Sequence, residues 1–345
     1  MRFLCRLVVA VVVVAPAALT QSLSAAQQFY NLGDLKLESG KAIHDCNLGY
    51  RTLGTLNADH SNAVLFPTWF SGSTDDLLKV VGPTQFFDPA PFFVILVDAI
   101  GNGVSCSPSN SKTQHGPKFP EFTILDMVES EHRLVTEKFR LQHIRAVMGQ
   151  SMGGMQTFEW LVRYPGFMDV GIPIVGSPRL TSYDMMLWRT EEEAILEDPA
   201  YHGGNYTVSP KMKTVMLLHN IDLTTPEFRV ATTSPAQFET FFAETEAGAS
   251  STFDANDWRW QMHAMLTQDI APGAPLGSAA TKIQARVLVI NAKQDHMVNP
   301  TPALTLAPLI HAQTIVLEGM CGHIAPSCEV EKIRPAIQAT LAAER

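Results

Sequence analysis

Residues 144–154 read IRAVMGQSMGG, and this stretch decides how the rest of the chain is interpreted. Its first five residues form a short, mostly apolar run containing Ile and Val, which is typical of a buried strand. Gly149, Ser151 and Gly153 follow in the pattern Gly-x-Ser-x-Gly, and residues 152–164 have the length of a helix. A serine between a buried strand and a helix, with glycines that allow a tight turn, predicts a nucleophile elbow.

The same alternation of strand and helix continues on both sides of this stretch. Short apolar runs of this kind are typical of parallel strands buried on both faces, and helix-length segments separate several of them. The sequence therefore predicts an α/β fold, with a mostly parallel sheet flanked by helices. The expected strands are residues 63–66, 92–97, 144–148, 170–175, 287–290 and 314–317, preceded by a pair at 29–37 and 42–53 that we expect to be antiparallel at the sheet edge.

The alternation stops between about residues 179 and 280, where the chain becomes helical and irregular. Since the strand pattern resumes afterwards, both flanks are needed to complete one sheet. We interpret the segment as a helical lid inserted into one catalytic domain, residues 27–345. Its Trp and Met residues, such as Trp188 and Met262, leave two alternatives open, an apolar acyl pocket or ordinary core.

The chain begins with MRFLCRLVVAVVVVAPAALTQSLSAA, in which two arginines precede an apolar core and small residues end the segment. This order predicts a signal peptide over residues 1–26, cleaved before Gln27. The apolar core is shorter than the roughly 20 residues that a membrane-spanning helix requires. We therefore expect a secreted or periplasmic protein that is not bound to a membrane after cleavage.

Composition narrows the classes of partner. The formal charge of −9, which becomes −11 when a leader with two arginines is removed, is opposite in sign to a nucleic-acid-binding surface. No metal-ligand cluster or Gly-rich phosphate loop is evident, so we expect no metal, no cofactor and a small-molecule acyl substrate. Export permits disulfides, but the sequence leaves open how Cys46, Cys106, Cys321 and Cys328 pair.

Ser151 needs a base to remove its proton and a carboxylate to orient that base. In this architecture the order along the chain is serine, acid, histidine. Asp295 follows the expected strand 287–290 and is the predicted acid. Asp184, after the preceding strand, is the reserve candidate.

The predicted base is His323, which lies in a glycine-containing loop after the last expected strand. Such a loop at the carboxyl end of a strand can present an imidazole to the elbow. His296 and His311 also follow the resumed strands, and we interpret both as surface or structural histidines.

The tetrahedral intermediate of an acyl transfer requires hydrogen-bond donors for its oxyanion. We expect one to be the backbone N–H of Met152, the residue after the nucleophile. The second should come from the loop after strand 63–66, where Trp69 and Phe70 are the two candidates.

Several segments carry a resemblance to a known family. They are residues 149–156 (GQSMGGMQ), 50–57 (YRTLGTLN), 177–181 (SPRLT) and 253–256 (FDAN). Together they resemble the homoserine O-acetyltransferase branch of the α/β-hydrolase superfamily, over nearly the whole chain after the leader. The resemblance implies the α/β-hydrolase fold with an inserted helical lid, a triad of Ser151, Asp295 and His323, and a homodimer formed through the lid as an arrangement to test.

Two positions depart from that family's pattern. The family typically has Asp directly after the catalytic His and Arg in the first lid helix, and uses both to hold homoserine. The matching positions here are Ile324 and Glu192, so a zwitterionic amino acid would lose two charged partners. An exported protein also lacks a ready supply of acetyl-CoA.

The sequence therefore predicts a secreted serine hydrolase that cleaves a carboxylic ester or related acyl compound through an acyl-enzyme intermediate. The alternative is an acyltransferase like homoserine O-acetyltransferase. A binding protein that kept the fold without catalysis is the third hypothesis.

Overall fold

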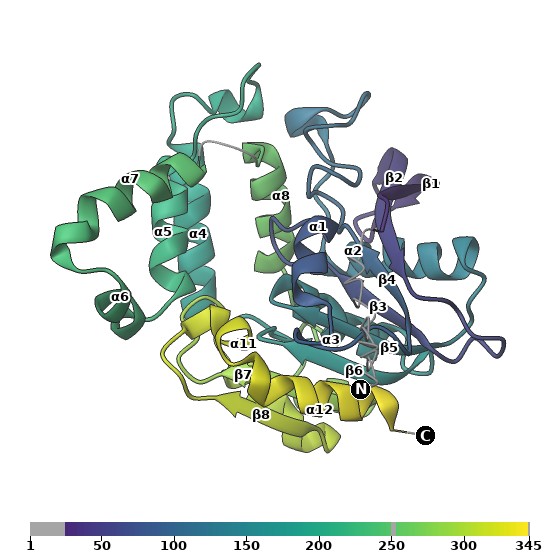
Figure 1. Cartoon of the computed structure of the whole chain (residues 1–345). Coiled ribbons are helices and arrows are strands. Elements are labelled where there is room, and N and C mark those ends of the chain that lie inside the picture. Colours follow the sequence, from purple (N-terminus) through teal and green to yellow (C-terminus); the bar gives the residue numbers. More distant parts are fainter. Residues whose placement is uncertain (1–24, 250–252, 344–345) are drawn as a thin grey trace, which may run out of the picture.

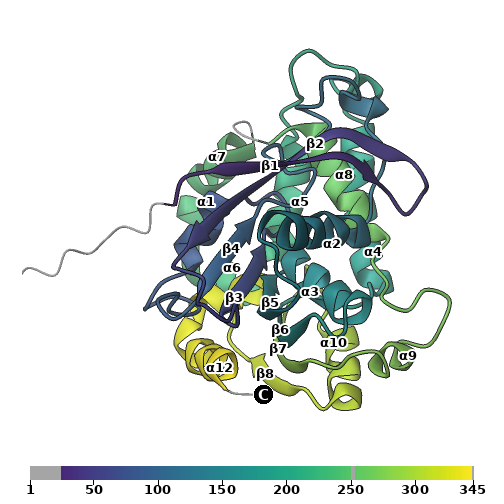
Figure 2. The same cartoon turned by 90° about the vertical axis from the view of Figure 1, so that its right-hand side faces the viewer.

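An eight-stranded sheet forms the centre of the computed structural model, which describes residues 25–249 and 253–343. The strand order is β1-β2-β4-β3-β5-β6-β7-β8, which Figure 2 shows from β1 and β2 down to β8. β2 is antiparallel to both of its neighbours, and the other adjacent strands are parallel. The strands are β1 (Gln28–Lys36), β2 (Ala42–Leu53), β3 (Ala63–Pro67), β4 (Phe93–Val97), β5 (Ile144–Gln150), β6 (Met168–Ile174), β7 (Arg286–Ala292) and β8 (Gln313–Leu317). The predicted α/β fold is confirmed.

Alternate residues of the central strands enter two separate cores. In β3, Ala63 and Leu65 join the core that contains residues of α2 and α3, whereas Val64 and Phe66 join the core that contains residues of α1 and α12. All four side chains are fully buried, and each large one contributes about 1.5–3 kcal/mol relative to exposure. The helices are α1 (Thr74–Leu77), α2 (Ile124–Arg133), α3 (Met152–Arg163), α10 (Thr301–Leu306), α11 (Ala325–Cys328) and α12 (Val330–Ala342).

A chain of helices connects β6 to β7, and we call residues 179–280 the helical insertion. In Figure 1 its helices α4, α5 and α7 stand to one side of the sheet, and α8 lies between them and the sheet. The helices are α4 (Ser182–Leu196), α5 (Lys213–Leu223), α6 (Pro226–Thr232), α7 (Phe238–Ala249), α8 (Ala255–Leu266) and α9 (Gly277–Ala280). The role of this segment as a lid stays a prediction.

Short helical turns complete the fold. The helical segment between β4 and β5 is α2 followed directly by a π-helical segment, Leu134–Lys138. Thr123 caps α2 by accepting a hydrogen bond from the N–H of Asp126. The short segments are η1 (Leu78–Val80), η2 (Gly116–Lys118), η3 (Leu134–Lys138, π-helical), η4 (His202–Gly204), η5 (Pro235–Gln237), η6 (Ala307–Ile310) and η7 (Gly322–Ile324).

Two disulfides resolve the cysteine pairing. Cys46 of β2 is bonded to Cys106 in the loop after β4, and Cys321 is bonded to Cys328 at the end of α11. The first joins residues 60 apart in sequence, and the second joins residues seven apart.

The predicted signal peptide falls almost entirely on residues 1–24, which lie outside the described residues, so its cleavage stays a prediction. Within residues 25–249 and 253–343, none of the helices has both the length and the apolar character needed to cross a bilayer.

Candidate active site

Ser151 occupies the turn between β5 and α3. Its backbone has φ 56° and ψ −121°, a conformation that residues with a side chain rarely adopt. A Cβ atom on Gly149 would lie 2.2 Å from the carbonyl oxygen of Gly153, and one on Gly153 would lie 2.8 Å from that of Pro67. Glycine is therefore required on both sides of the serine, at Gly149 by the turn itself and at Gly153 by the end of the neighbouring strand β3.

The structure brings together the serine, histidine and aspartate that the sequence selects. His323 Nε2 lies 2.8 Å from Ser151 Oγ, and His323 Nδ1 lies 2.7 Å from Asp295 Oδ2. Asp295 follows β7 and His323 lies in η7 after β8, so all three occupy the carboxyl edge of the sheet. Their exposed fractions are 7% for Ser151 and 4% for each of the others. This is the geometry of a nucleophile hydrogen-bonded to an oriented base.

Asp295 has donors for both of its carboxylate oxygens. Oδ1 accepts hydrogen bonds from the backbone N–H groups of Met297 and Val298, each at 2.9 Å, while Oδ2 faces His323 Nδ1. Three donors stabilise the ionised carboxylate even though it is buried. Nδ1 of His323 therefore donates to Asp295, and Nε2 is left to accept the proton of the Ser151 hydroxyl.

Asp184, the reserve acid, has a different position and different partners. Its Oδ2 accepts from the N–H and the hydroxyl of Thr181, which caps α4, and its Oδ1 accepts from the N–H of Asn299. Burial raises the pKa of this carboxyl. Asp184 thus fixes the start of the insertion against the loop after β7, and it is Asp295 that contacts His323.

The loop that carries His323 is held on two sides. The disulfide between Cys321 and Cys328 closes a short loop around the histidine. On the side of the insertion, the hydroxyl of Thr225 at the start of α6 donates to the carbonyl of Met320. Both contacts limit the movement of the imidazole relative to the serine.

The loop after β3 leaves amides available for an oxyanion. The N–H of Thr68 bonds to the carbonyl of Val97 and that of Ser71 bonds to the side chain of Gln261, but between them Trp69 and Phe70 donate no backbone hydrogen bond to the described residues. The N–H of Met152, the first residue of α3, is equally unengaged within the described chain. Both sequence candidates stay open for the second donor, since two neighbouring amides are free.

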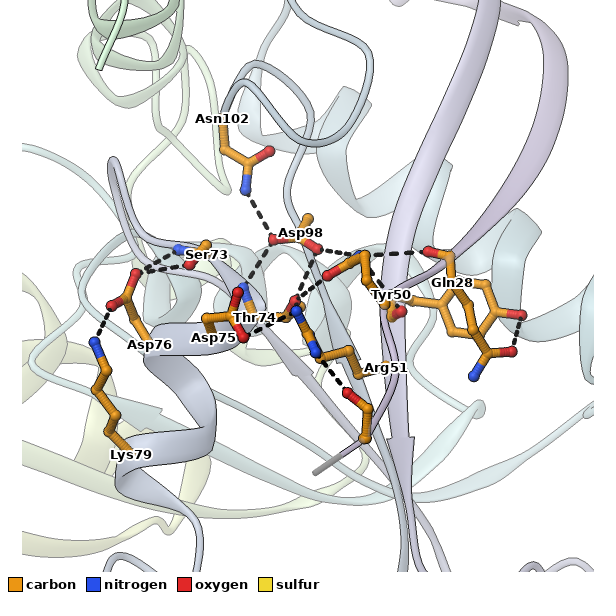
Figure 3. A network of polar contacts seen from close by, with 12 residues as sticks. Gln28, Tyr50, Arg51, Ser73, Thr74, Asp75, Asp76, Lys79, Asp98 and Asn102 are labelled. Carbon is orange, nitrogen blue, oxygen red and sulfur yellow. Dashed lines mark hydrogen bonds and ion pairs between the residues drawn. The ribbon is translucent and has the colours of Figure 1, made fainter. Parts of the chain in front are cut away.

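A buried aspartate that the sequence analysis missed anchors the far end of this loop. Figure 3 shows Asp98 at the centre of a polar network. Its carboxylate accepts from the N–H and hydroxyl of Thr74 at 2.8 and 3.0 Å and from Asn102 Nδ2 at 3.0 Å, and Asn102 also bonds to the carbonyl of Gly72. Gln27 Nε2 adds a further donor at 2.9 Å. An acidic residue directly after a buried strand is the signal that would have found it.

A cavity of about 380 Å³ opens above Ser151. Most of its lining surface is apolar, the ion pair of Asp76 and Lys79 also borders it, and the insertion supplies one side. A larger hollow of about 890 Å³ lies beside residues that precede β3, β4 and β5, at the opposite edge of the sheet from the serine. The cavity at Ser151 is lined by Trp69, Phe70, Ser71, Asp76, Lys79, Val80, Gln150, Ser151, Trp188, His219, Leu223, Met297, His323, Ile324 and Ser327.

The residues at the positions that depart from the family's pattern are not arranged to hold an amino acid. Ile324 presents an apolar side chain to the cavity. Glu192 forms an ion pair with Arg259 of α8, with 3.1 Å between its Oε1 and the Arg Nε. Of the two residues left open between pocket and core, Trp188 lines the cavity and Met262 is buried in the core.

The family model described as alpha/beta hydrolase fold matches residues 85–327, and the chain belongs to this family. Within it, the resemblance to the homoserine O-acetyltransferase branch is confirmed, and the chain is similar to esterases as well. An ethyl acetate hydrolase of Pseudomonas veronii is 32% identical over 86% of this chain and 89% of its own length. A homoserine O-acetyltransferase of Nostoc punctiforme is 30% identical over 90% of this chain and 95% of its own. The solved structure of the acetyl esterase MekB superimposes with a TM-score of 0.86 at 28% identity, covering 92% of this chain and 97% of that one.

Proposed function

We propose that this chain is a serine hydrolase that cleaves a carboxylic ester or related acyl compound. The observation that carries the proposal is the hydrogen-bonded series Ser151, His323, Asp295 at the base of a largely apolar cavity. Its relatives are ester-cleaving and acyl-transferring enzymes, which supports an enzyme of one of these two classes.

The proposed reaction has two halves. Ser151 Oγ attacks the acyl carbonyl carbon as His323 Nε2 takes its proton, and the N–H of Met152 with that of Trp69 or Phe70 stabilises the oxyanion. Collapse of the intermediate breaks the ester bond, and the leaving alcohol takes the proton from His323. Water then attacks the acyl-enzyme with His323 as base, and the carboxylic acid leaves as Ser151 regains its proton.

Three observations support water rather than an amino acid as the acyl acceptor. Ile324 is apolar and Glu192 is already paired with Arg259, so the cavity does not offer the two charged partners of homoserine at these positions. Two of the relatives named above are an ethyl acetate hydrolase and an acetyl esterase, and a cavity of about 380 Å³ suits a small ester. Acyl transfer to an alcohol is the alternative, which the homoserine O-acetyltransferase relative favours.

The test is hydrolysis of p-nitrophenyl acetate by the wild type and by Ser151→Ala. We expect the variant to lose about 10⁶-fold in kcat and to lose covalent labelling by a fluorophosphonate. Labelling of Ser151→Ala at the wild-type rate would contradict the assignment of the nucleophile. Thiol release from acetyl-CoA, with and without homoserine, separates the two reactions, since homoserine-dependent release would replace hydrolysis by transfer.

A further inference from the structure

A second pair of histidine and carboxylate faces the same cavity from the insertion. His219 of α5 places its Nδ1 3.2 Å from Oε1 of Glu191 in α4. The side chain of Glu191 is fully buried, whereas that of His219 is 14% exposed and lines the cavity that contains Ser151. An imidazole outside the triad therefore borders the space in which a substrate would bind.

Aromatic side chains fix the orientation of this imidazole. The rings of Phe70, Trp188 and Trp258 surround it at centroid distances of 5.9, 6.1 and 5.1 Å. Because Nδ1 is turned towards Glu191, the other ring nitrogen is the one available to a ligand. Nε2 of His219 has no hydrogen-bond partner within the described part of the chain.

The surroundings of Glu191 make the imidazole its polar partner. Its Oε1 faces His219, and its Oε2 is buried with no hydrogen-bond partner among the described residues. A buried carboxyl in such a place is costly unless an adjacent polar group compensates it. The hydrogen bond between Oε1 and Nδ1 therefore fixes the imidazole and leaves Nε2 turned away from Glu191.

The state of Nε2 determines what His219 offers to the cavity. A histidine ring has a hydrogen on Nε2 when it is protonated and also when Nδ1 accepts a hydrogen bond instead of donating one. In either form His219 would give the cavity a fixed hydrogen-bond donor, separate from the backbone amides expected to hold the ester carbonyl.

We propose that His219 is a substrate-binding residue whose Nε2–H donates to a second acceptor oxygen of the ester, beyond the carbonyl that is attacked. This inference rests on the proposed hydrolase function and specifies its substrate class. The preferred substrates are small esters with an additional ether, keto or hydroxyl oxygen in the acyl or the alcohol part. Phe70 and Trp188, which also line the cavity, are positioned to contact the carbon skeleton.

The experiment compares esters that differ by one CH₂ replaced by oxygen. p-Nitrophenyl butyrate and p-nitrophenyl methoxyacetate test the acyl side, and butyl acetate and 2-methoxyethyl acetate test the alcohol side. For each pair, the ratio of kcat/KM for the oxygen-containing ester to that for its partner is measured in every variant. Differences in intrinsic reactivity cancel when these ratios are compared, and so does the folded fraction of each sample.

We expect His219→Phe and the smaller His219→Leu to lower the ratio for one ester pair about tenfold, the effect of one hydrogen bond. His219→Gln retains a side-chain N–H and should keep part of the preference. Leu223→Met, one turn further along α5 and in the same cavity, is the matched control and should keep the wild-type ratio.

Unchanged ratios for both ester pairs in His219→Phe and His219→Leu would overturn the inference. An equal decrease in Leu223→Met would overturn it too, because packing alone would then explain the preference. If the wild type hydrolyses none of the four esters and is not labelled by a fluorophosphonate, the proposed hydrolase function fails instead.

Discussion

Two histidine–carboxylate pairs border one cavity, and they are built differently. The pair at the sheet edge, His323 with Asp295, is complete, because Asp295 has backbone donors as well as the imidazole and His323 Nε2 is bonded to Ser151. The pair in the insertion, His219 with Glu191, has a single internal hydrogen bond. The two pairs therefore have different proposed roles: the first imidazole accepts the proton of Ser151, and the second donates a hydrogen bond to the substrate.

A third buried carboxyl shows what a single donor does in this fold. Glu131 of α2 is fully buried, and Trp160 Nε1 donates to its Oε2 at 2.7 Å. Burial raises its pKa to about 8. With one neutral donor, Glu131 retains its proton near neutral pH.

The largest expected effect comes from removing the charge of each carboxylate in turn. Asp295→Asn should lower kcat about 10⁴-fold, because the amide no longer stabilises the imidazolium and favours the wrong tautomer of His323. Glu191→Gln should lower kcat by less than about tenfold, since a single hydrogen bond to a group other than the nucleophile is altered. Steady-state hydrolysis of p-nitrophenyl acetate, with active sites titrated by a fluorophosphonate, measures both. If Asp295→Asn and Glu191→Gln lost the same factor in kcat, the two histidine–carboxylate pairs would not differ in role as proposed.

The second expected effect concerns the disulfide that closes the loop around His323. No disulfide encloses His219 among the described residues. Replacing Cys321 and Cys328 together by Ser should lower kcat about 10- to 100-fold with a smaller change in KM, because the base moves relative to Ser151. Mild reduction should have the same effect, since Cys328 is exposed.

The other disulfide is the control. Removing the disulfide Cys46–Cys106 opens a longer loop than removing Cys321–Cys328. It should lower the free energy of unfolding by about 4 kcal/mol, compared with about 2.5 kcal/mol for the shorter loop, but it should lower kcat less. Urea unfolding and kcat, measured on both double variants, give the comparison. A loss of kcat that follows stability in both variants would show that the short disulfide does not position His323.

The last expected effect is on the pH dependence of stability, with no expected effect on the chemistry at Ser151. Because the pKa of Glu131 is about 8 when folded and near 4.5 otherwise, the folded protein holds a proton that the unfolded chain releases between these pH values. The free energy of unfolding should therefore fall as pH rises from 5 to 8, by up to about 1.4 kcal/mol per pH unit from this group. Glu131→Gln should remove this contribution to the slope, as measured by urea unfolding at several pH values.

Asp257 of α8, whose pKa burial also raises to about 8, is the matched carboxyl in the insertion. Asp257→Asn should flatten the slope similarly. An unchanged slope in Glu131→Gln would mean that Glu131 is ionised when folded.

The fold was predictable because its signals are local. Each central strand is a short run of Val, Ile and other apolar residues, and the turn of the elbow itself requires Gly149. Asp295 and His323 could be selected because each follows a strand at the same edge of the sheet, and the order of the strands was sufficient to bring them near Ser151.

The residues that were missed depend on contacts between elements distant in sequence or joined irregularly. His219 and Glu191 meet across two helices of the insertion, whose packing no local periodicity specifies. The cysteine pairing depends on how the loop after β4 folds back on β2. The structure does not decide whether Trp69 or Phe70 supplies the second oxyanion donor. The backbone N–H groups of both have no acceptor among the described residues, whereas those of Thr68 and Ser71 on either side are bonded.

The backbone of Ser151 has one consequence for how such a chain can change. A residue with a side chain held at φ 56° costs on the order of 1–3 kcal/mol, a substantial part of the margin by which a typical domain remains folded. Glycine at this position would relieve the strain and remove the nucleophile in a single substitution. Selection for thermal robustness alone would therefore favour an inactive descendant, so the serine persists only where its chemistry is under selection.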